Sequence, residues 1–289
     1  MFGLIEAGGT KVMVGIATAH DDIRAVHRIP TTTPRETWAA VIEWLQGAAA
    51  DHGAISAIGV ASFGPLDLDC ASPAWGSITR TTKQHWDHVD LAGPLKAAFG
   101  CPVGFDTDVN AAALAESLWG ASVGQALSLY LTVGTGVGGG IVSDGRILKG
   151  LSHPEMGHIH LPKHPADANF SGICPFHGAC LEGLASGPAI KARWGASLSD
   201  LPIDHPGHAI IAHYLAHAVC TFQSILEPGR IIMGGGVMAT DGLLDRVRGA
   251  AAEIGKGYFV GNPHDVIMPP GLGDQSGLLG ALALAQTAL

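Results

Sequence analysis

Residues 129–142 constrain the fold of this chain more than any other stretch. They read LYLTVGTGVGGGIV, in which two apolar runs flank a turn made largely of glycine. This pattern predicts a β-hairpin. Glycine costs backbone entropy on folding, so a turn with this many glycines needs a reason. One reason is the close approach of a phosphate to backbone N–H groups and to the Thr135 hydroxyl; the other is a merely flexible hairpin tip.

A second unit of the same kind lies near residue 1. Residues 8–11, GGTK, stand between the apolar runs 2–5 and 12–16, so they predict another hairpin. This turn has its own threonine, Thr10, and adds a cation, Lys11. Two such hairpins favour two related lobes with a phosphate between them. The turn is not a P-loop, because it lacks the G-x-x-x-x-G-K-[ST] spacing and leads into a strand instead of a helix.

The size and composition of the chain disfavour several classes of protein. Its 289 residues suggest two domains or one domain in two lobes. A net charge of −9 without a basic cluster makes nucleic acid and anionic membrane surfaces poor partners. We expect neither a signal peptide nor a membrane-spanning segment. The five cysteines form no regular disulfide framework, so we expect reduced thiols and a cytoplasmic protein.

Hydrophobic periodicity predicts alternating strands and helices, which is typical of the α/β class. The first predicted helix, residues 34–52, has Thr33 as its N-cap and Pro34 at its first position. The further predicted helices are residues 91–99, 111–119, 207–226, 241–255 and 276–289, with another starting at 188–194, and the further predicted strands are residues 55–61, 103–105, 228–233 and 266–269. We expect the terminal helix to pack on the first lobe. Residues 75–86 form a polar loop with two tryptophans, which suits either a sugar cover or an irregular surface loop.

Polar side chains gather where the predicted strand 103–105 gives way to a helix. The sequence there is Asp106-Thr107-Asp108-Val109-Asn110. Asp and Asn are favoured helix caps, and capping alone explains one such residue. Three exceed what capping needs. The functional interpretation is a general base, Asp108, with Asn110 binding a substrate hydroxyl.

A group of cysteines and histidines follows in residues 153–186. Cys174, His177 and Cys180 have the spacing C-x2-H-x2-C, and His158 lies upstream. Two thiolates and two imidazoles suit a closed tetrahedral zinc site. The alternative is a set of unrelated loop residues in a chain with 15 histidines, and the fourth ligand is open between His158 and three others: His153, His160 and His164.

Two glutamates and a third glycine turn complete the set of candidate residues. Glu155 and Glu182 flank the cysteines and histidines, where each suits either a surface charge or a contact to a polyol. The third turn, residues 234–238, reads GGGVM and lies between a predicted strand and a predicted helix. A turn of this kind lets an adenine or a ribose lie against bare backbone.

Together these stretches resemble the ROK family of sugar kinases, and most closely its bacterial fructokinase branch. The resemblance covers nearly the whole chain and rests on the GGTK, GTGVGGG and GGG turns, on Glu155-Met156-Gly157-His158, and on the Cys174–Gly183 segment. It implies an actin-like ATPase (ribonuclease H-like) fold, in which two α/β lobes hold ATP and sugar in a central cleft. The implied lobes are residues 1–110, completed by the helix 276–289, and residues 111–275, which carry the zinc-binding loop.

The resemblance also implies a reaction, D-fructose plus ATP to D-fructose 6-phosphate plus ADP, with Asp108 as general base. Mg2+ would neutralise the phosphates. The sugar would contact Asn110, Glu155, His158 and Glu182, and structural zinc would bind to His158, Cys174, His177 and Cys180, so that His158 serves twice. The nucleotide would contact Gly8, Gly9, Thr10, Lys11, Gly134, Thr135, Gly136, Gly138, Pro188, Gly234, Gly235, Gly236, Val237 and Met238. The family also implies a homodimer.

Three positions depart from many ROK kinases. Glu6 stands in place of Asp, Thr107 in place of Asn, and His177 in place of a zinc-binding cysteine. All three look like the fructokinase branch and weaken a glucokinase interpretation. The alternatives are a mannokinase or glucokinase of broad hexose specificity and a non-catalytic sugar-sensing regulator of the same fold. ROK repressors carry an N-terminal DNA-binding domain, which we do not expect here. A zinc hydrolase is disfavoured, because four protein ligands leave no position for water.

Overall fold

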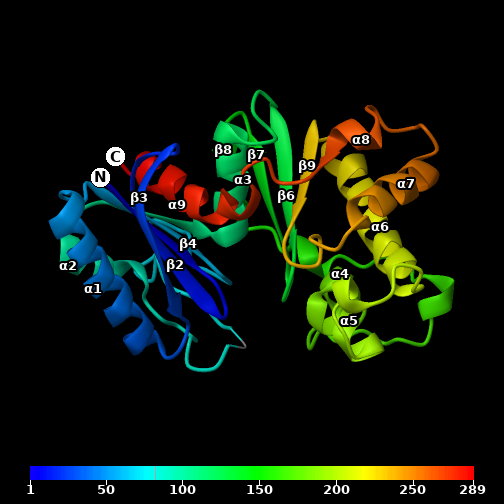
Figure 1. Cartoon of the computed structure of the whole chain (residues 1–289), viewed down its shortest axis with the longest axis horizontal. Helices are drawn as coiled ribbons and strands as arrows, with labels where there is room; N and C mark the ends of the chain where they lie inside the picture. Colours follow the sequence, from blue (N-terminus) through cyan, green and yellow to red (C-terminus); the bar gives the residue numbers. More distant parts are fainter. Residues whose placement is uncertain (82) are drawn as a thin grey trace. The chain divides into compact units, whose positions relative to one another are not determined.

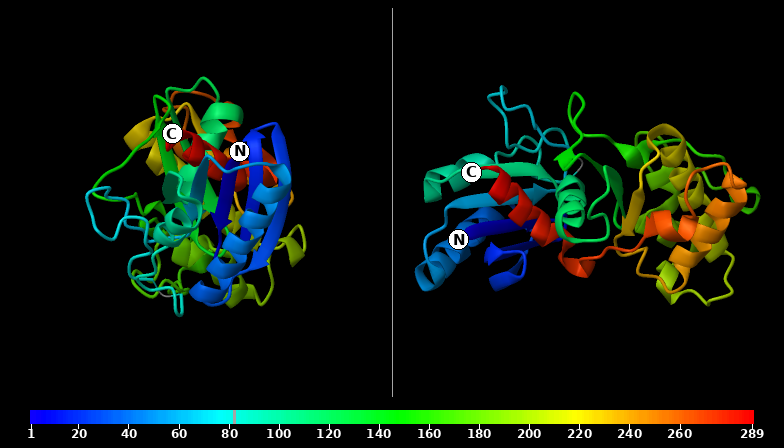
Figure 2. Two further views of the ribbon diagram at one scale, coloured as in Figure 1. Left: turned by 90° about the vertical axis from the view of Figure 1, so that its left-hand side faces the viewer. Right: turned by 90° about the horizontal axis from the view of Figure 1, so that it is seen from above.

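The computed structural model describes residues 1–81 and 83–289, so Thr82 of the predicted polar loop lies outside the described residues. The chain forms two compact units (Figures 1 and 2). The first unit comprises Met1–Gly120, Arg146–His153 and Leu272–Leu289. The second comprises Ala121–Gly145 and Pro154–Gly271. The units are described one at a time.

The first unit is built on a mixed sheet with the strand order β3-β2-β1-β4-β5. Its strands are β1 (Phe2–Ala7), β2 (Lys11–Ala19), β3 (Asp22–Pro30), β4 (Ala57–Ser62) and β5 (Val103–Thr107). β1 and β2 are antiparallel, with Ala7 opposite Val12, so the predicted GGTK hairpin is confirmed. β1, β4 and β5 are parallel. The carboxyl ends of these three strands therefore meet at one edge of the sheet, where α/β proteins commonly bind ligands.

Helices cover both faces of this sheet. α1 (Pro34–His52) and α2 (Ala92–Phe99) share one apolar core with it, through Trp38, Leu45 and Leu95. The N-cap of α1 is Thr33, as predicted. α9 (Ser276–Thr287), red in Figure 1, packs on the sheet so closely that a Cβ atom at Gly59 would lie 1.7 Å from the Ala281 carbonyl oxygen. α3 (Asp108–Trp119) packs on α9 in the same unit. The terminal helix thus packs on the first unit, as expected.

β3 is an element that the hydrophobic pattern did not predict. Within it only Ile29 is buried, and the strand carries polar residues such as Arg24 and Arg28 at an edge of the sheet. Its pairing with β2 also has irregular register near Ile16 and Ala17. An edge strand with one buried side chain gives little alternation, which is the signal that identifies a strand from sequence.

The second unit has a sheet with the order β10-β9-β6-β7-β8. The strands within this unit are β6 (Leu127–Val133), β7 (Val137–Ser143), β9 (Arg230–Gly234) and β10 (Ile267–Met268). The residues of β8 (Arg146–Ile147) belong to the segment assigned to the first unit. β6 and β7 pair antiparallel with Val133 opposite Val137, so the hairpin predicted from residues 129–142 is confirmed. Its helices are α4 (Leu181–Ala185), α5 (Gly187–Trp194), α6 (Gly207–Leu226), α7 (Leu243–Gly255) and α8 (Pro263–Val266). Short 3-10 turns span Met156–His158, Pro165–Asp167 and Leu198–Asp200 here, and Gly273–Gln275 in the first unit.

α6 is the central helix of this second core. Within the described residues it is the one helix that is long and apolar enough to cross a membrane. However, 61% of its most apolar 18-residue stretch is buried inside the protein. The core helix of a water-soluble domain passes the same test of length and hydropathy. Tyr214, Leu215 and Phe222 pack in a cluster with the strands β6 and β9, which explains the apolar composition of the helix without a membrane.

Candidate active site and metal site

Asp108 is the first residue of α3, directly after β5. Its Oδ1 atom accepts a hydrogen bond from the Val109 N–H at 2.9 Å. Burial, with a smaller contribution from the nearby Glu6 carboxylate, raises the pKa of Asp108 to about 7. A carboxyl group that titrates near neutral pH is suited to proton transfer. Capping of α3 does not need Asp108, because Thr107 is the N-cap and accepts the Asn110 N–H at 3.1 Å.

Asn110 lies one turn into α3 and is fully buried. Its Nδ2 atom donates to Asp106 Oδ1 at 2.7 Å. Its Oδ1 atom has no hydrogen-bond partner among the described residues. Buried polar atoms are nearly always paired, so an unpaired acceptor in the same helical turn as Asp108 indicates a position for a ligand hydroxyl.

Glu6, at the end of β1, belongs to the same edge of the sheet. Burial raises its pKa, while the Lys11 ammonium lowers it. A Cβ atom at Gly277, in the first turn of α9, would lie 2.4 Å from the Glu6 carboxyl group. The glycine therefore gives the carboxylate room beside the positive end of a helix dipole.

The first glycine turn, residues 8–11, is held by hydrogen bonds to its backbone carbonyls, while the space around Gly9 stays open. Thr31 Oγ1 donates to the Gly8 carbonyl at 2.9 Å, and Lys83 Nζ donates to the Gly9 carbonyl. A Cβ atom at Gly9 would meet nothing within 4 Å, so no contact within the protein requires glycine there. Gly9, Thr10 and Lys11 are exposed. Bare backbone of this kind permits the close approach of a ligand.

The second and third glycine turns meet in the second unit. The Gly187 N–H, in the first turn of α5, donates to the Gly134 carbonyl at 2.7 Å, and the Val237 N–H donates to the Val133 carbonyl at 2.9 Å. Gly235 has φ of +93°, a conformation that favours glycine. These contacts surround a cavity of about 310 Å³. A cavity of this size is in the range of small-molecule sites.

The lining of this cavity includes residues that the sequence analysis predicted and residues that it missed. Predicted were Gly134, Thr135, Pro188, Gly236 and Val237; missed were Gly187, Ile190, Ser197, Leu198, Ser199 and Thr240. The buried Thr240 hydroxyl has no partner among the described residues. Ser197 and Ser199 come from a short segment between helices that has no glycine run, so the sequence carried no signal for them. No described residue that lines the cavity is charged. The described lining therefore offers an anion only backbone N–H groups and hydroxyl groups.

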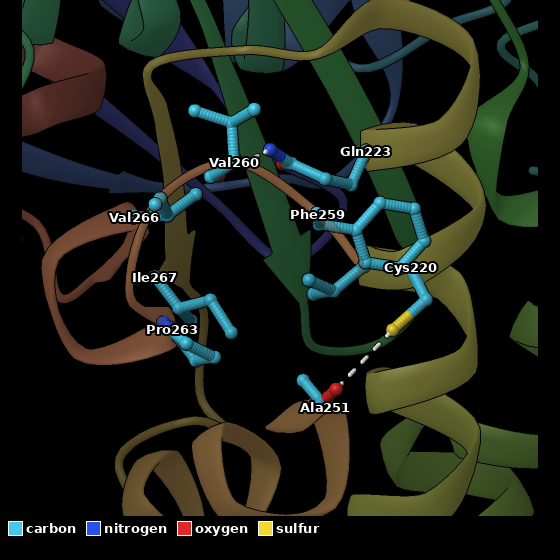
Figure 3. Close-up of a pocket in the computed structure, with 10 residues that line it drawn as sticks. Cys220, Gln223, Ala251, Phe259, Val260, Pro263, Val266 and Ile267 are labelled. Carbon is cyan, nitrogen blue, oxygen red and sulfur yellow. Dashed lines mark hydrogen bonds between the residues drawn. The ribbon is translucent and has the colours of Figure 1, made fainter. Parts of the chain in front are cut away.

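Another cavity lies between α6, α7 and the α8–β10 segment (Figure 3). It measures about 30 Å³ and is lined mainly by apolar side chains, among them Phe259 and Val266. Cys220 Sγ donates across its base to the Ala251 carbonyl at 3.7 Å. A cavity of this volume holds about one water molecule. It is therefore too small for a sugar or a nucleotide.

The structure brings the predicted metal ligands together. One ligand atom from each of His158, Cys174, His177 and Cys180 lies within 4.8 Å of the others. His158 Nδ1 is 3.5 Å from Cys180 Sγ and 3.8 Å from Cys174 Sγ. Burial, with smaller contributions from Cys174 and Glu182, raises the pKa of the Cys180 thiol to about 11. A coordinated cation reverses that shift by stabilising the thiolate, so the donor set fits a tetrahedral metal ion.

The other three histidines considered as a fourth ligand are not part of this group of four ligand atoms. His153 belongs to the first unit, where its Nε2 accepts the Leu66 N–H at 3.3 Å. The His164 ring stands edge-on to His213, with ring centroids 5.0 Å apart. His160 pairs through its backbone with Cys180. The geometry thus favours His158 over each of them.

The two flanking glutamates differ in their surroundings. Glu182 Oε2 accepts the Val137 N–H at 3.0 Å and thereby links α4 to the second glycine turn. A Cβ atom at Gly136 would lie 2.7 Å from the same oxygen, which explains a glycine at that position. Glu155 is exposed and precedes the 3-10 turn that carries His158. Their predicted contacts to sugar stay predictions.

A family model for the ROK family matches residues 2–288 of the chain. The chain belongs to the ROK family. It is 50% identical over 292 residues to the fructokinase of Zymomonas mobilis, a match that covers 100% of this chain and 97% of the relative. A ROK hexokinase from Thermus thermophilus has 28% identity and a TM-score of 0.80, with 99% and 98% of the two chains covered.

A second solved ROK structure is informative about ligands. The ROK family glucokinase from Streptomyces griseus, solved in complex with glucose and AMPPNP, has 25% identity, a TM-score of 0.77 and 99% coverage of both chains. The predicted family and its actin-like ATPase fold are therefore confirmed. The roles assigned to individual side chains remain predictions.

Proposed function

We propose that this ROK protein is an ATP-dependent hexose kinase that transfers the γ-phosphoryl group of ATP to the 6-hydroxyl of D-fructose. The choice of fructose as the substrate rests on the 50% identity to a fructokinase over the full chain. The use of ATP is supported by the likeness to a ROK glucokinase solved with AMPPNP and by the uncharged cavity beside the glycine turns.

Asp108 takes the proton from the attacking hydroxyl in this proposal. Its raised pKa makes it a stronger base than an ordinary aspartate while leaving it largely ionised at slightly alkaline pH. Asn110 Oδ1 accepts a hydrogen bond from a sugar hydroxyl and so orients the ring. Phosphoryl transfer needs mainly positioning and neutralisation of charge. The backbone N–H groups of the glycine turns, together with Thr10 and Thr135, supply positioning, and Mg2+ bound with ATP supplies positive charge.

Zinc held by His158, Cys174, His177 and Cys180 has a structural role in the proposal. Four protein ligands close the coordination sphere and leave no position for a reacting water. The metal fixes a long loop segment between β7 and α4 that contains little regular structure. The predicted sugar contacts Glu155, His158 and Glu182 lie in or beside this segment. We further propose a cytoplasmic homodimer without nucleic-acid or membrane partners.

The test is a coupled ADP-release assay with Mg-ATP and fructose, mannose or glucose in parallel. We expect the highest kcat/KM on fructose and no ADP release without sugar. If mannose or glucose is the preferred substrate, the assignment of fructose is wrong, but the assignment of phosphoryl transfer from ATP to a hexose stands. If a sugar binds but none of the three is turned over, the assignment of kinase activity is wrong, and a sugar-sensing protein is indicated instead.

A further inference from the structure

Asp106 is a buried carboxylate next to the proposed base, and the mechanism above does not use it. It is 1% exposed at the end of β5. Its Oδ1 atom accepts from Asn110 Nδ2 at 2.7 Å and from the Thr107 N–H at 2.8 Å. Its Oδ2 atom is 3.1 Å from Lys149 Nζ. A buried carboxylate is costly unless it is paired and hydrogen-bonded, and this one meets both conditions.

Lys149 comes from the short segment Arg146–His153, through which the chain returns to the first unit. Its side chain is 45% exposed, so water reaches the ion pair from one side. The same segment is held at its other end, where the Leu66 N–H donates to His153. The segment that positions Lys149 beside Asp106 is therefore itself bound to the loop that follows β4.

The hydrogen bond to Asp106 fixes the orientation of the Asn110 side-chain amide. An ionised carboxylate accepts hydrogen bonds and cannot donate one, so only the NH2 group of Asn110 can face it. The amide oxygen is thereby turned away from Asp106. This oxygen is the buried atom without a partner among the described residues. Leaving a buried acceptor unpaired is unfavourable, so the arrangement is ready for a donor supplied from outside.

We propose that Asp106 and Lys149 are positioning residues of the sugar site: the ion pair holds the Asp106 carboxylate in place, and Asp106 orients Asn110 so that the site accepts a hydrogen bond from one sugar hydroxyl. The proposal rests on the proposed function and adds a selection rule to it. At one ring position, the site selects a hydroxyl group that can donate a hydrogen bond to Asn110 Oδ1. A sugar with hydrogen or fluorine there loses that hydrogen bond.

The test measures the binding of fructose and of its monodeoxy analogues by isothermal titration calorimetry, with steady-state kinetics alongside. The variants are Asp106→Asn and Lys149→Met, with Lys149→Arg as the conservative variant. Lys191→Met is the matched control, because Lys191 is an exposed lysine on α5 with no assigned role. Circular dichroism checks that each variant is folded.

In the wild type, one deoxy position should weaken binding about tenfold, which is the loss of one hydrogen bond. In Asp106→Asn the amide can turn over, so fructose should bind about tenfold more weakly while the penalty at that position disappears. Lys149→Met should shift binding in the same direction, Lys149→Arg should remain near the wild type, and KM for ATP should not move.

The outcomes separate this inference from the proposed function. If the wild type turns over fructose but both variants keep its affinity and its deoxy penalty, the positioning role is wrong. If the wild type turns over no hexose, the proposed function is wrong. Should Asp106→Asn not fold, the comparison between Lys149→Met and Lys149→Arg decides, because Lys149 is half-exposed and its side chain is not part of the apolar core.

Discussion

At the scale of single residues, the proposed chemistry depends on Asp108. Replacing it by Asn keeps the shape of the side chain and removes the base. We predict a fall in kcat of about 10² to 10⁴, the usual contribution of general base catalysis, with KM for fructose within a few-fold of the wild type. Steady-state kinetics measures both constants. A variant with the wild-type kcat would remove Asp108 from the mechanism.

The same residue predicts a pH dependence of activity. Asp108 acts as a base only when it is ionised, and its pKa is raised to about 7, chiefly by burial. The kcat of the wild type should therefore fall as the pH drops from 8 to 6, approaching a tenfold loss per pH unit below the pKa. A profile that stays flat over this range would contradict the assignment.

Stability should respond to Asp108 in the opposite sense. Its pKa is raised on folding, so the stabilising contribution of the protonated form is present at low pH and is lost as the pH rises towards 7. At pH 8 the Asp108→Asn variant should be more stable than the wild type, by about 2 kcal/mol, and the difference should shrink at pH 5. Urea unfolding at both pH values measures it. A variant less stable at pH 8 would indicate that Asp108 stabilises the fold as a charge.

At the scale of elements, the metal-binding loop is the clearest case. Cys174→Ser should lose the metal and lower the free energy of unfolding by about 3 kcal/mol or more, because binding energy at a structural site is folding energy. Cys70 is exposed and offers the matched control Cys70→Ser. Atomic emission should find one zinc per chain in the wild type and in the control. Equal metal content in Cys174→Ser would contradict the zinc site.

The contact between α9 and the first sheet gives a second prediction for elements. Gly59→Ala should destabilise the protein by about 3 kcal/mol or more, because the new methyl group would meet the Ala281 carbonyl at 1.7 Å. The control is Gly47→Ala within α1, where a Cβ atom meets nothing within 4 Å and alanine favours the helix by about 1 kcal/mol. Thermal unfolding compares the two. Equal melting temperatures would mean that the helix can move away from the sheet.

Sequence reasoning predicted the elements whose signals are local. Both glycine hairpins and the Thr33 cap were predicted because turn and cap chemistry lies in neighbouring residues. β3 was missed because an edge strand with one buried residue lacks alternation. The sequence carried no signal for the proposed roles of Asp106 and Lys149, because their ion pair joins residues distant in the chain. It carried none for Thr240 either, whose buried hydroxyl without a partner among the described residues shows only in the structure.

At the scale of the whole molecule, each unit supplies one part of the proposed reaction. The first carries the carboxyl group of perturbed pKa, Asp108, and the amide of Asn110 that we propose orients the sugar, both just after β5. The second carries the glycine-lined cavity and the Cys/His cluster. The ROK family match extends over both units, from residue 2 to residue 288. The proposed activity therefore belongs to the complete chain.

The measurement that tests this account most directly is 31P NMR of the purified protein with Mg-ATP and fructose. The account predicts that fructose 6-phosphate and ADP appear one for one, and that neither appears with the Asp108→Asn variant at the same concentration and time. ADP formed without a sugar phosphate, or a phosphate on a hydroxyl other than that of C6, would contradict it.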